Sequence, residues 1–300
     1  MDFVAKLPVP VIAFALTAGL TTAGFCLSTR VRYYVRLTVY FTTLHVVALI
    51  ALPIAIVNYG QPNNFRIAAG MFYYLRFLFG VRWHLHGREN IKRKPYVIVS
   101  NHQSAIDVIG MLVHWDTFHP VVPVIKAELR YALTFGLFCN LSGAVFVDRG
   151  TEKGRQALHN ALALLKRDRT SIWIFPEGTR NYGKTPLLPF KKGAFHMAIQ
   201  TQFPILPVVF SDYSPFYNSP MQRFDSGSAS LTILPEIPVK GLTSEHVSEL
   251  CDHTYAIMLK ALTPESHGGN EKSYSDSPVS TSGSSEESSM SWASPTPISH

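Results

Sequence analysis

Hydrophobic positions divide the 300 residues of this chain into regions of different character. Two long apolar stretches come first, at Leu7–Leu27 and Leu37–Val57, and each has about the twenty residues that a membrane-spanning helix needs. Residues 63–82 mix apolar and basic positions, and residues 83–263 alternate between strand-like and helical spacing. The pattern predicts N-terminal membrane helices within residues 1–62, followed by a folded domain.

The two apolar stretches are compatible with more than one topology. Arg30, Arg32 and Arg36 lie between them, and short basic loops are retained in the cytosol. Two full spans would then carry the remaining chain to the far side of the membrane, whereas a helical hairpin that dips into one leaflet would return it to the cytosol. A cleaved signal peptide is less favoured, because the first stretch is long and a second one follows soon after.

Residues 63–82 form an amphipathic segment. Aromatic and aliphatic side chains are interspersed with Arg66, Arg76 and Arg82, which is typical of a helix that lies in the membrane interface. A helix in the core of the folded domain is the alternative interpretation of the same pattern.

Short runs rich in β-branched and aromatic residues predict strands in the rest of the chain, and segments with helical spacing lie between most of them. The predicted strands are Tyr96–Ser100, Val121–Ile125, Ala144–Val147, Ser171–Phe175, Ile205–Phe210 and Leu231–Ile233. The predicted helices are Ala105–His114, Glu128–Asn140, Glu152–Arg167, Gly193–Gln200 and Ser244–Leu262. This alternation predicts an α/β domain over residues 83–263, with a partly parallel sheet.

Charge separates the C-terminal residues from the rest of the chain. Residues 264–300 are rich in Ser and acidic residues and poor in apolar ones, which predicts a disordered tail. The whole chain has a formal net charge of +7 in spite of this acidic tail, so the body of the protein is basic. A basic body suits an anionic membrane surface, an anionic substrate or nucleic acid. Because no nucleic-acid-binding motif is present, we expect no nucleic-acid partner.

A histidine and an aspartate follow the first predicted strand of the domain. The sequence Asn101-His102-Gln103-Ser104-Ala105-Ile106-Asp107 places His102 where the strand turns into a helix and Asp107 about one helical turn later. If the turn brings the two side chains together, the carboxylate orients one ring nitrogen and leaves the other free to act as a base. Such a base needs no Ser or Cys nucleophile when the substrate brings its own hydroxyl. A capped helix with a surface histidine is the alternative for these two residues taken alone.

Basic residues follow three other predicted strands. Lys126 and Arg149 come after the second and third strands, and Arg180 ends the segment Phe-Pro-Glu-Gly-Thr-Arg at 175–180. Arginine binds phosphate in a bidentate manner. Because ligands of open α/β sheets collect at the carboxyl ends of the strands, we expect these three cations to lie near His102.

The order of these segments resembles a known enzyme family. The 1-acylglycerol-3-phosphate acyltransferase family has four ordered sequence blocks, and similar segments occur here at Asn101–Asp107, Lys126–Arg149, Phe175–Arg180 and Leu206–Val209. The resemblance covers roughly residues 80–235. It implies a glycerolipid-acyltransferase-like mixed sheet flanked by helices, with an N-terminal helix pair in one face of the membrane.

The resemblance also implies roles for the matching residues. His102 would deprotonate the sn-2 hydroxyl of 1-acylglycerol 3-phosphate (lysophosphatidic acid), and Asp107 would orient His102. The phosphate of this acceptor would be held by a set of neighbouring residues: Lys126, Arg149, Glu177, Gly178, Thr179 and Arg180. The hydroxyl would attack the thioester of acyl-CoA, a co-substrate, to form phosphatidic acid. We further expect backbone N–H groups near Ala105 to stabilise the oxyanion.

Two alternatives remain open for the function. One is an acyltransferase that acts on another lysophospholipid or on glycerol 3-phosphate, and the other is a non-catalytic lipid-binding membrane protein. The Ser-rich tail favours a eukaryotic source, which indicates the endoplasmic reticulum membrane with the catalytic domain facing the cytosol.

We expect no cofactor and no metal. His84 and His86 share one strand face, but no third ligand of suitable spacing accompanies them. Cys26, Cys139 and Cys251 are too widely spaced for a Cys-based zinc site or a disulfide framework.

Overall fold

The computed structural model describes residues 9–118, 120–182 and 185–263. The tail that the sequence predicts to be disordered, residues 264–300, lies outside the described residues.

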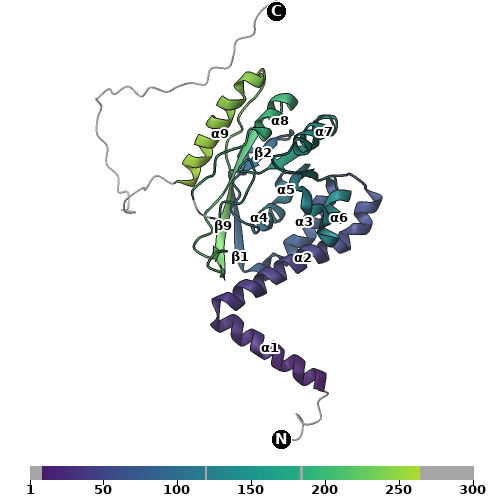
Figure 1. The fold of residues 1–300 in the computed structure, drawn as a ribbon, viewed down its shortest axis with the longest axis vertical. Helices are drawn as coiled ribbons and strands as arrows, with labels where there is room; N and C mark the ends of the chain where they lie inside the picture. The colour runs from purple at the N-terminus through teal and green to yellow at the C-terminus, as the bar shows by residue number, and fades with distance from the viewer. Residues whose placement is uncertain (1–8, 119, 183–184, 264–300) are drawn as a thin grey trace, which may run out of the picture. The chain divides into compact units, whose positions relative to one another are not determined.

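Seven described strands form one mixed sheet (Figure 1). The strands are β1 (Val81–His86), β2 (Val97–Ser100), β3 (Val121–Lys126), β4 (Val145–Val147), β5 (Ser171–Ile174), β6 (Ile205–Phe210) and β9 (Gly227–Ile233), in the spatial order β1-β9-β6-β2-β5-β3-β4. From β6 to β4 all neighbours are parallel, whereas β9 pairs antiparallel with β6 and parallel with β1. The predicted mixed sheet is confirmed, and β2 to β5 end at the same edge.

The central strands are apolar because both of their faces are covered. Every residue of β2, β5 and β6 is buried, and these strands read as nearly continuous runs of Val, Ile, Leu, Phe and Trp. Continuous apolar runs are typical of parallel strands that have helices on both sides.

The helices of the α/β domain surround this sheet. They are α4 (Asp107–Val113), α5 (Trp115–Phe118), α6 (Leu133–Leu141), α7 (Glu152–Asp168), α8 (Gly193–Thr201) and α9 (Val247–Leu262), with short 3-10 turns at Arg88–Asn90, Ala127–Tyr131 and Ser244–His246. The single helix predicted for 128–140 is wrong: a 3-10 turn ends at Tyr131 and α6 begins at Leu133. The break occurs because Leu133 has a left-handed φ of 43°, which a continuous right-handed helix does not allow.

The arginine-rich segment near the N-terminus is helical and is not a loop. After α1 (Val9–Leu27), the side chain of Ser28 caps α2 (Thr29–Val57), so the predicted loop forms the first turns of α2. Arg32 forms an ion pair with Asp225, at 2.8 Å from Nε to Oδ1. Arg36 donates to the hydroxyl of Ser226 at 2.8 Å. Two of the three arginines therefore bind the α/β domain, at the residues that directly follow its small hairpin of β7 (Tyr217–Asn218) and β8 (Arg223–Phe224).

Helix α2 packs along the α/β domain with one face only. The buried face includes Tyr40, Leu44 and Ala48, whereas Leu49 and Ile50 on the other face are more than half exposed. Within the described residues, α2 is the one helix that is long and apolar enough to cross a membrane. Helix α2 contacts α3 (Asn63–Leu75) and α6, which lie beside it in Figure 1.

The segment at 63–82 combines both interpretations that its pattern allows. Phe65 and Phe72 of α3 are buried in the core, whereas Tyr74 and Phe77 are exposed by 75% and 73%. A 3-10 turn at Arg76–Phe79 then leads into β1. One face of this segment is thus core, and the other presents aromatic side chains and arginines to the surroundings.

Candidate active site

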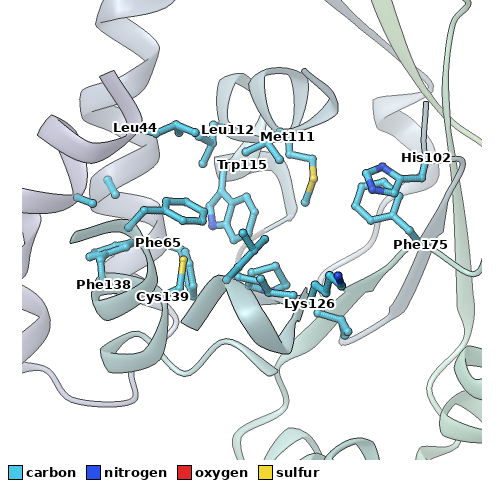
Figure 2. Close-up of a pocket in the computed structure, with 18 of the residues that line it drawn as sticks. Leu44, Phe65, His102, Met111, Leu112, Trp115, Lys126, Phe138, Cys139 and Phe175 are labelled. Atoms are coloured by element: carbon cyan, nitrogen blue, oxygen red, sulfur yellow. The ribbon is translucent and has the colours of Figure 1, made fainter. Parts of the chain in front are cut away.

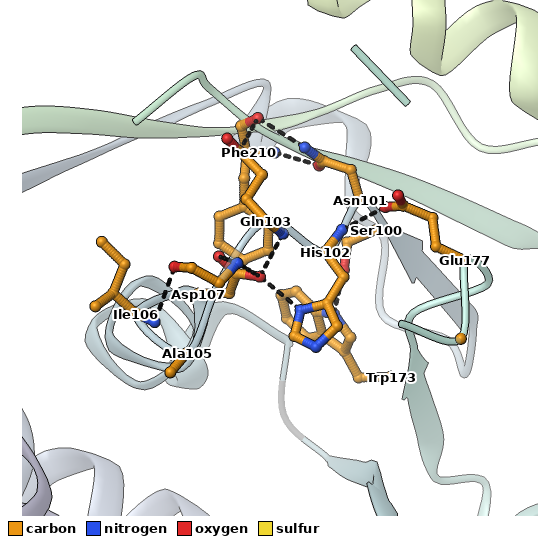
Figure 3. Close-up of polar contacts among 12 residues, drawn as sticks. Ser100, Asn101, His102, Gln103, Ala105, Ile106, Asp107, Trp173, Glu177 and Phe210 are labelled. Atoms are coloured by element: carbon orange, nitrogen blue, oxygen red, sulfur yellow. Dashed lines mark hydrogen bonds and ion pairs between the residues drawn. The ribbon is translucent and has the colours of Figure 1, made fainter. Parts of the chain in front are cut away.

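His102 and Asp107 form a buried pair at the carboxyl end of β2 (Figure 3). Nδ1 of His102 lies 2.6 Å from Oδ2 of Asp107, so the turn does bring the two side chains together. The imidazole stacks on Phe175, with ring centroids 4.1 Å apart. Since Nδ1 is bound to Asp107, Nε2 is the ring nitrogen that remains for a substrate.

Asp107 also holds the turn that carries His102. Its Oδ2 accepts a hydrogen bond from the backbone N–H of Gln103 at 2.8 Å, and both carboxylate oxygens lie 3.2 Å from the backbone nitrogen of Ser104. The N–H of Ile106 donates to the hydroxyl of Ser104. The N–H groups of Ser104 and Ile106, on both sides of Ala105, therefore already have partners, and the oxyanion site near Ala105 stays a prediction that concerns the other N–H groups at this helix start.

Asn101 and Gln103 fasten the same turn to the end of β6. The backbone N–H of Phe210 donates to Oδ1 of Asn101 at 2.8 Å, and Nδ2 of Asn101 donates to the carbonyl of Phe210 at 3.0 Å. Nε2 of Gln103 donates to the carbonyls of Phe210 and Ser211. The asparagine side chain thus imitates a pair of sheet hydrogen bonds, which explains why an Asn precedes the histidine.

Glu177 connects this turn to the segment that follows β5. Its Oε1 accepts a hydrogen bond from the backbone N–H of His102 at 2.5 Å, and its Oε2 accepts one from Leu188 at 3.1 Å. Glu177 is only 3% exposed. Burial raises the pKa of Glu177 to about 7, although the two backbone N–H groups oppose this shift. The sequence places Glu177 among the phosphate-binding residues, whereas the structure turns its carboxylate toward the backbone of His102.

Three cations lie at the edge of the sheet, as the strand ends predict. Nη1 of Arg149 donates to the carbonyl of Gly178 at 2.7 Å. Burial lowers the pKa of Arg149, and the positive charge of Arg180 lowers it further. No acid among the described residues forms an ion pair with either arginine, whereas the exposed Lys126 is paired with Glu128 at 2.9 Å.

Gly178 has a conformation that suits glycine. Its φ is 68°, and a Cβ at this position would lie 2.9 Å from Cε and Nζ of Lys191. A side chain here would therefore strain the backbone and displace Lys191.

A cavity of about 450 Å³ joins these groups. Its polar end is lined by His102, Lys126, Arg149, Gly178, Thr179 and Arg180. Its other end is apolar and is lined by side chains from α2, α3, α4, α5 and α6, including Leu44, Phe65, Met111, Trp115 and Phe138 (Figure 2). Asp107 and Glu177 do not line the cavity; they support its wall from behind.

Comparisons with known proteins agree with this geometry. The Acyltransferase family profile matches residues 82–211. Human 1-acyl-sn-glycerol-3-phosphate acyltransferase alpha is 35% identical over 258 residues, which cover 84% of this chain and 89% of the human protein. This chain belongs to the 1-acyl-sn-glycerol-3-phosphate acyltransferase family. Human 1-acyl-sn-glycerol-3-phosphate acyltransferase beta is 32% identical, and the alignment covers 81% of this chain and 89% of that protein.

A solved structure shows the same fold. The 1-acyl-sn-glycerophosphate (LPA) acyltransferase PlsC from Thermotoga maritima has 23% sequence identity and a TM-score of 0.61, and the match covers 78% of this chain and 93% of that one. At this identity the likeness concerns the fold, which the sequence predicts as glycerolipid-acyltransferase-like.

Two residues of this acyltransferase site are not predicted by the sequence. The hydroxyl of Tyr40, in α2, donates to the carbonyl of Ala105 at 2.9 Å and so joins the N-terminal helix to the turn. Tyr213 is buried near Asp107; burial raises its pKa, and the charge of Asp107 adds to the shift. Both residues lie far in sequence from the turn, and no local motif marks them.

The described residues contain no group of three or more His, Cys, Asp or Glu side chains suited to a metal ion. His84 and His86 lie on one face of β1, as predicted, and both are exposed.

We expect the substitution Glu177→Gln to weaken the pH dependence of stability. The pKa of Glu177 is raised from 4.5 to about 7 on folding, so the stability that its neutral form contributes is complete below pH 4.5 and is lost as pH rises through 7. The loss amounts to at most about 3 kcal/mol. A glutamine stays neutral, so the Tm of the variant should fall less than that of the wild type between pH 5 and 8, measured by thermal unfolding in detergent.

Glu249→Gln, at an exposed position of α9, is the matched control and should leave the slope of Tm against pH unchanged. Identical slopes for the wild type and Glu177→Gln would contradict the raised pKa.

Proposed function

We propose that this protein transfers a fatty acyl group from acyl-CoA to the sn-2 hydroxyl of lysophosphatidic acid and so forms phosphatidic acid. One observation carries the proposal: a buried His102–Asp107 pair stands where the cationic end of a cavity meets its apolar end. Lysophosphatidic acid has a phosphate, a hydroxyl and an acyl chain in the same order. The two human relatives are named as acyltransferases of 1-acyl-sn-glycerol 3-phosphate.

The chemistry needs one base and no nucleophile from the protein. Nε2 of His102 takes the proton from the acceptor hydroxyl as its oxygen attacks the thioester carbonyl of acyl-CoA. The C–S bond then breaks, and the proton on His102 passes to the departing thiolate, which leaves as CoA. Asp107, bound to Nδ1 at 2.6 Å, stabilises the imidazolium that forms between these two events.

The acceptor phosphate would bind at the polar end of the cavity. Arg149 is the central group, since it is partly buried and is already oriented by its bond to Gly178. Arg180, Lys126 and Thr179 are more exposed and complete the site. The repulsion between Arg149 and Arg180 would be relieved by a phosphomonoester, which carries nearly two negative charges at neutral pH.

The apolar end of the cavity would hold an acyl chain. Each buried CH₂ group contributes about 0.8 kcal/mol to the free energy of binding. A long acyl chain buried in a cavity lined by Phe65, Trp115 and Phe138 would therefore bind much more tightly than a short one. Leu44 of α2 lines the same end. The N-terminal helices would therefore belong to the substrate site as well as to the membrane attachment.

The exposed face of α2 and the aromatic residues after α3 would attach the protein to a membrane. Because α2 packs on the α/β domain along much of its length, we favour attachment to one membrane face over two full spans. The catalytic domain would then lie on the cytosolic side, at the endoplasmic reticulum. Acyl-CoA is a co-substrate in this scheme, and we propose no cofactor and no metal.

Loss of the base should abolish turnover. We expect His102→Ala to lower kcat by about 10²–10⁴-fold and Asp107→Asn to have a similar effect, because the amide no longer stabilises the imidazolium. The measurement is acyl transfer from radiolabelled acyl-CoA to lysophosphatidic acid by purified protein. His86→Ala, on the exposed surface of β1, should keep the wild-type rate. A near-normal rate for His102→Ala would falsify the proposed mechanism.

The phosphate site predicts a preference among acceptors. Lysophosphatidylcholine has a phosphodiester with one negative charge and a bulky cationic group, so it would leave part of the arginine charge unpaired. We expect the wild type to prefer lysophosphatidic acid by at least about tenfold in kcat/KM. Arg180→Ala should lower kcat/KM for lysophosphatidic acid about tenfold, since a hydrogen bond to a charged group contributes about 1.5–3 kcal/mol to the free energy of binding.

The comparison of acceptors also decides between related functions. The KM for acyl-CoA should change little in Arg180→Ala, and Arg82→Ala, an exposed arginine of β1, is the charge-matched control. Equal use of both acceptors by the wild type would contradict the phosphate site and favour acylation of other lysophospholipids. If the wild type acylates glycerol 3-phosphate in place of lysophosphatidic acid, glycerol 3-phosphate is the acceptor.

Membrane attachment predicts the behaviour of the protein in cells. Alkaline carbonate should leave the protein in the membrane fraction, because α1 and the exposed face of α2 are apolar. Protease added to intact microsomes should digest the catalytic domain, since we expect that domain to face the cytosol. A fully protected domain would contradict attachment to the cytosolic face and would favour two full spans.

A further inference from the structure

A second cavity, of about 710 Å³, lies beside the first. It lies between α7 and α8, which pack against each other (Figure 1). Arg149, Phe175 and Gly178 line both cavities, so these residues form a shared wall. His102 does not line the second cavity, and the acyl transfer derived above does not use it.

The charge of the second cavity suits a polyanion. Its lining includes Lys191 and Lys192 at the start of α8, Arg155 on α7, and the histidines His159 and His196. Nζ of Lys192 donates to the hydroxyl of Ser248 at 2.8 Å. Among the described residues no acid forms an ion pair with Lys191 or Lys192.

Two acids also line this cavity and must be counted. Glu152 is bound to Arg155, three residues later on α7, so its charge is largely compensated. Asp148 is exposed and makes no side-chain ion pair among the described residues. Because Arg155 and Glu152 compensate each other, Lys191, Lys192 and Arg149 stand against Asp148 alone, which leaves the lysine side of the cavity positive.

The shape of the acyl donor explains why a second, polar cavity is needed. The thioester carbon has to lie near His102 in the first cavity, beside the hydroxyl of the acceptor. The nucleotide end of acyl-CoA carries a diphosphate and a 3′-phosphate, which an apolar pocket would exclude. A flexible pantetheine arm joins the two ends and can pass over the shared wall.

We propose that the second cavity binds the 3′-phospho-ADP end of acyl-CoA, with Lys191 and Lys192 on its phosphates and Arg155 facing them from α7. Lys191 marks the passage between the cavities, because its Cε and Nζ lie close over Gly178 in the shared wall. Lys192 lies one residue further from that wall and is held by Ser248. This inference rests on the proposed function, in which acyl-CoA is the acyl donor.

The experiment compares two acyl donors that share the thioester and differ in the nucleotide. Acyl-CoA carries all of the phosphates, whereas acyl-pantetheine carries none. We expect Lys192→Glu to raise the KM for acyl-CoA on the order of tenfold, which corresponds to about 1.4 kcal/mol, and to leave the KM for acyl-pantetheine and for lysophosphatidic acid unchanged. Lys191→Gln, a milder change, should shift the KM for acyl-CoA in the same direction.

Lys153→Glu is the matched control. Lys153 is an exposed residue of α7 that lines neither cavity, so this variant has the same change in charge and should keep the wild-type KM for both donors. A Tm measurement for each variant confirms that the protein is folded. The milder Lys191→Gln keeps the test decisive if Lys192→Glu does not fold.

The outcomes separate this inference from the proposed function. A rise in KM that is equal for acyl-CoA and acyl-pantetheine, or a rise for lysophosphatidic acid alone, overturns the nucleotide site. An unchanged KM for acyl-CoA in both lysine variants also overturns the nucleotide site. In that case the proposed function still holds, provided that the wild type transfers the acyl group from acyl-CoA. Failure of the wild type to transfer from either donor overturns the proposed function itself.

Discussion

The carboxylate of Asp107 accepts hydrogen bonds from the imidazole of His102 and from the backbone of the turn that carries this imidazole. The conformation of the turn and the orientation of the imidazole are therefore fixed by one buried group. This explains the spacing of four residues between His102 and Asp107, because the aspartate must begin α4 and still reach back over the turn. Asn101 and Glu177 hold the same turn from two other sides, so the protein itself fixes the position of the imidazole.

The parallel part of the sheet then determines which charges lie near this imidazole. Strands β2, β5, β3 and β4 are neighbours and run in the same direction, so His102, Arg149 and Arg180 reach one edge from segments that lie up to 78 residues apart in sequence. Burial lowers the pKa of Arg149, and the nearby positive charge of Arg180 lowers it further, so holding the charged Arg149 at this edge costs free energy. An anionic substrate would recover that cost on binding.

Local patterns predict most of the sheet and of the site, because strand identity and the position of a residue after a strand are local properties. The β-branched runs therefore give the strands, and the strand ends give His102, Arg149 and Arg180. The orientation of Glu177 depends on contacts between segments that are distant in sequence, which no local pattern contains. The bond from Tyr40 to Ala105 spans 65 residues and is of the same kind.

That bond also shows why the N-terminal helices and the α/β domain form one functional unit. Helix α2 contributes Tyr40 to the catalytic turn and Leu44 to the apolar end of the cavity, and its opposite face is apolar and exposed. The same helix thus lines the cavity on one side and leaves an apolar face exposed on the other. Removing it would open the apolar end of the cavity to water and release one anchor of the turn that holds His102. The α/β domain alone is therefore an incomplete acyltransferase site.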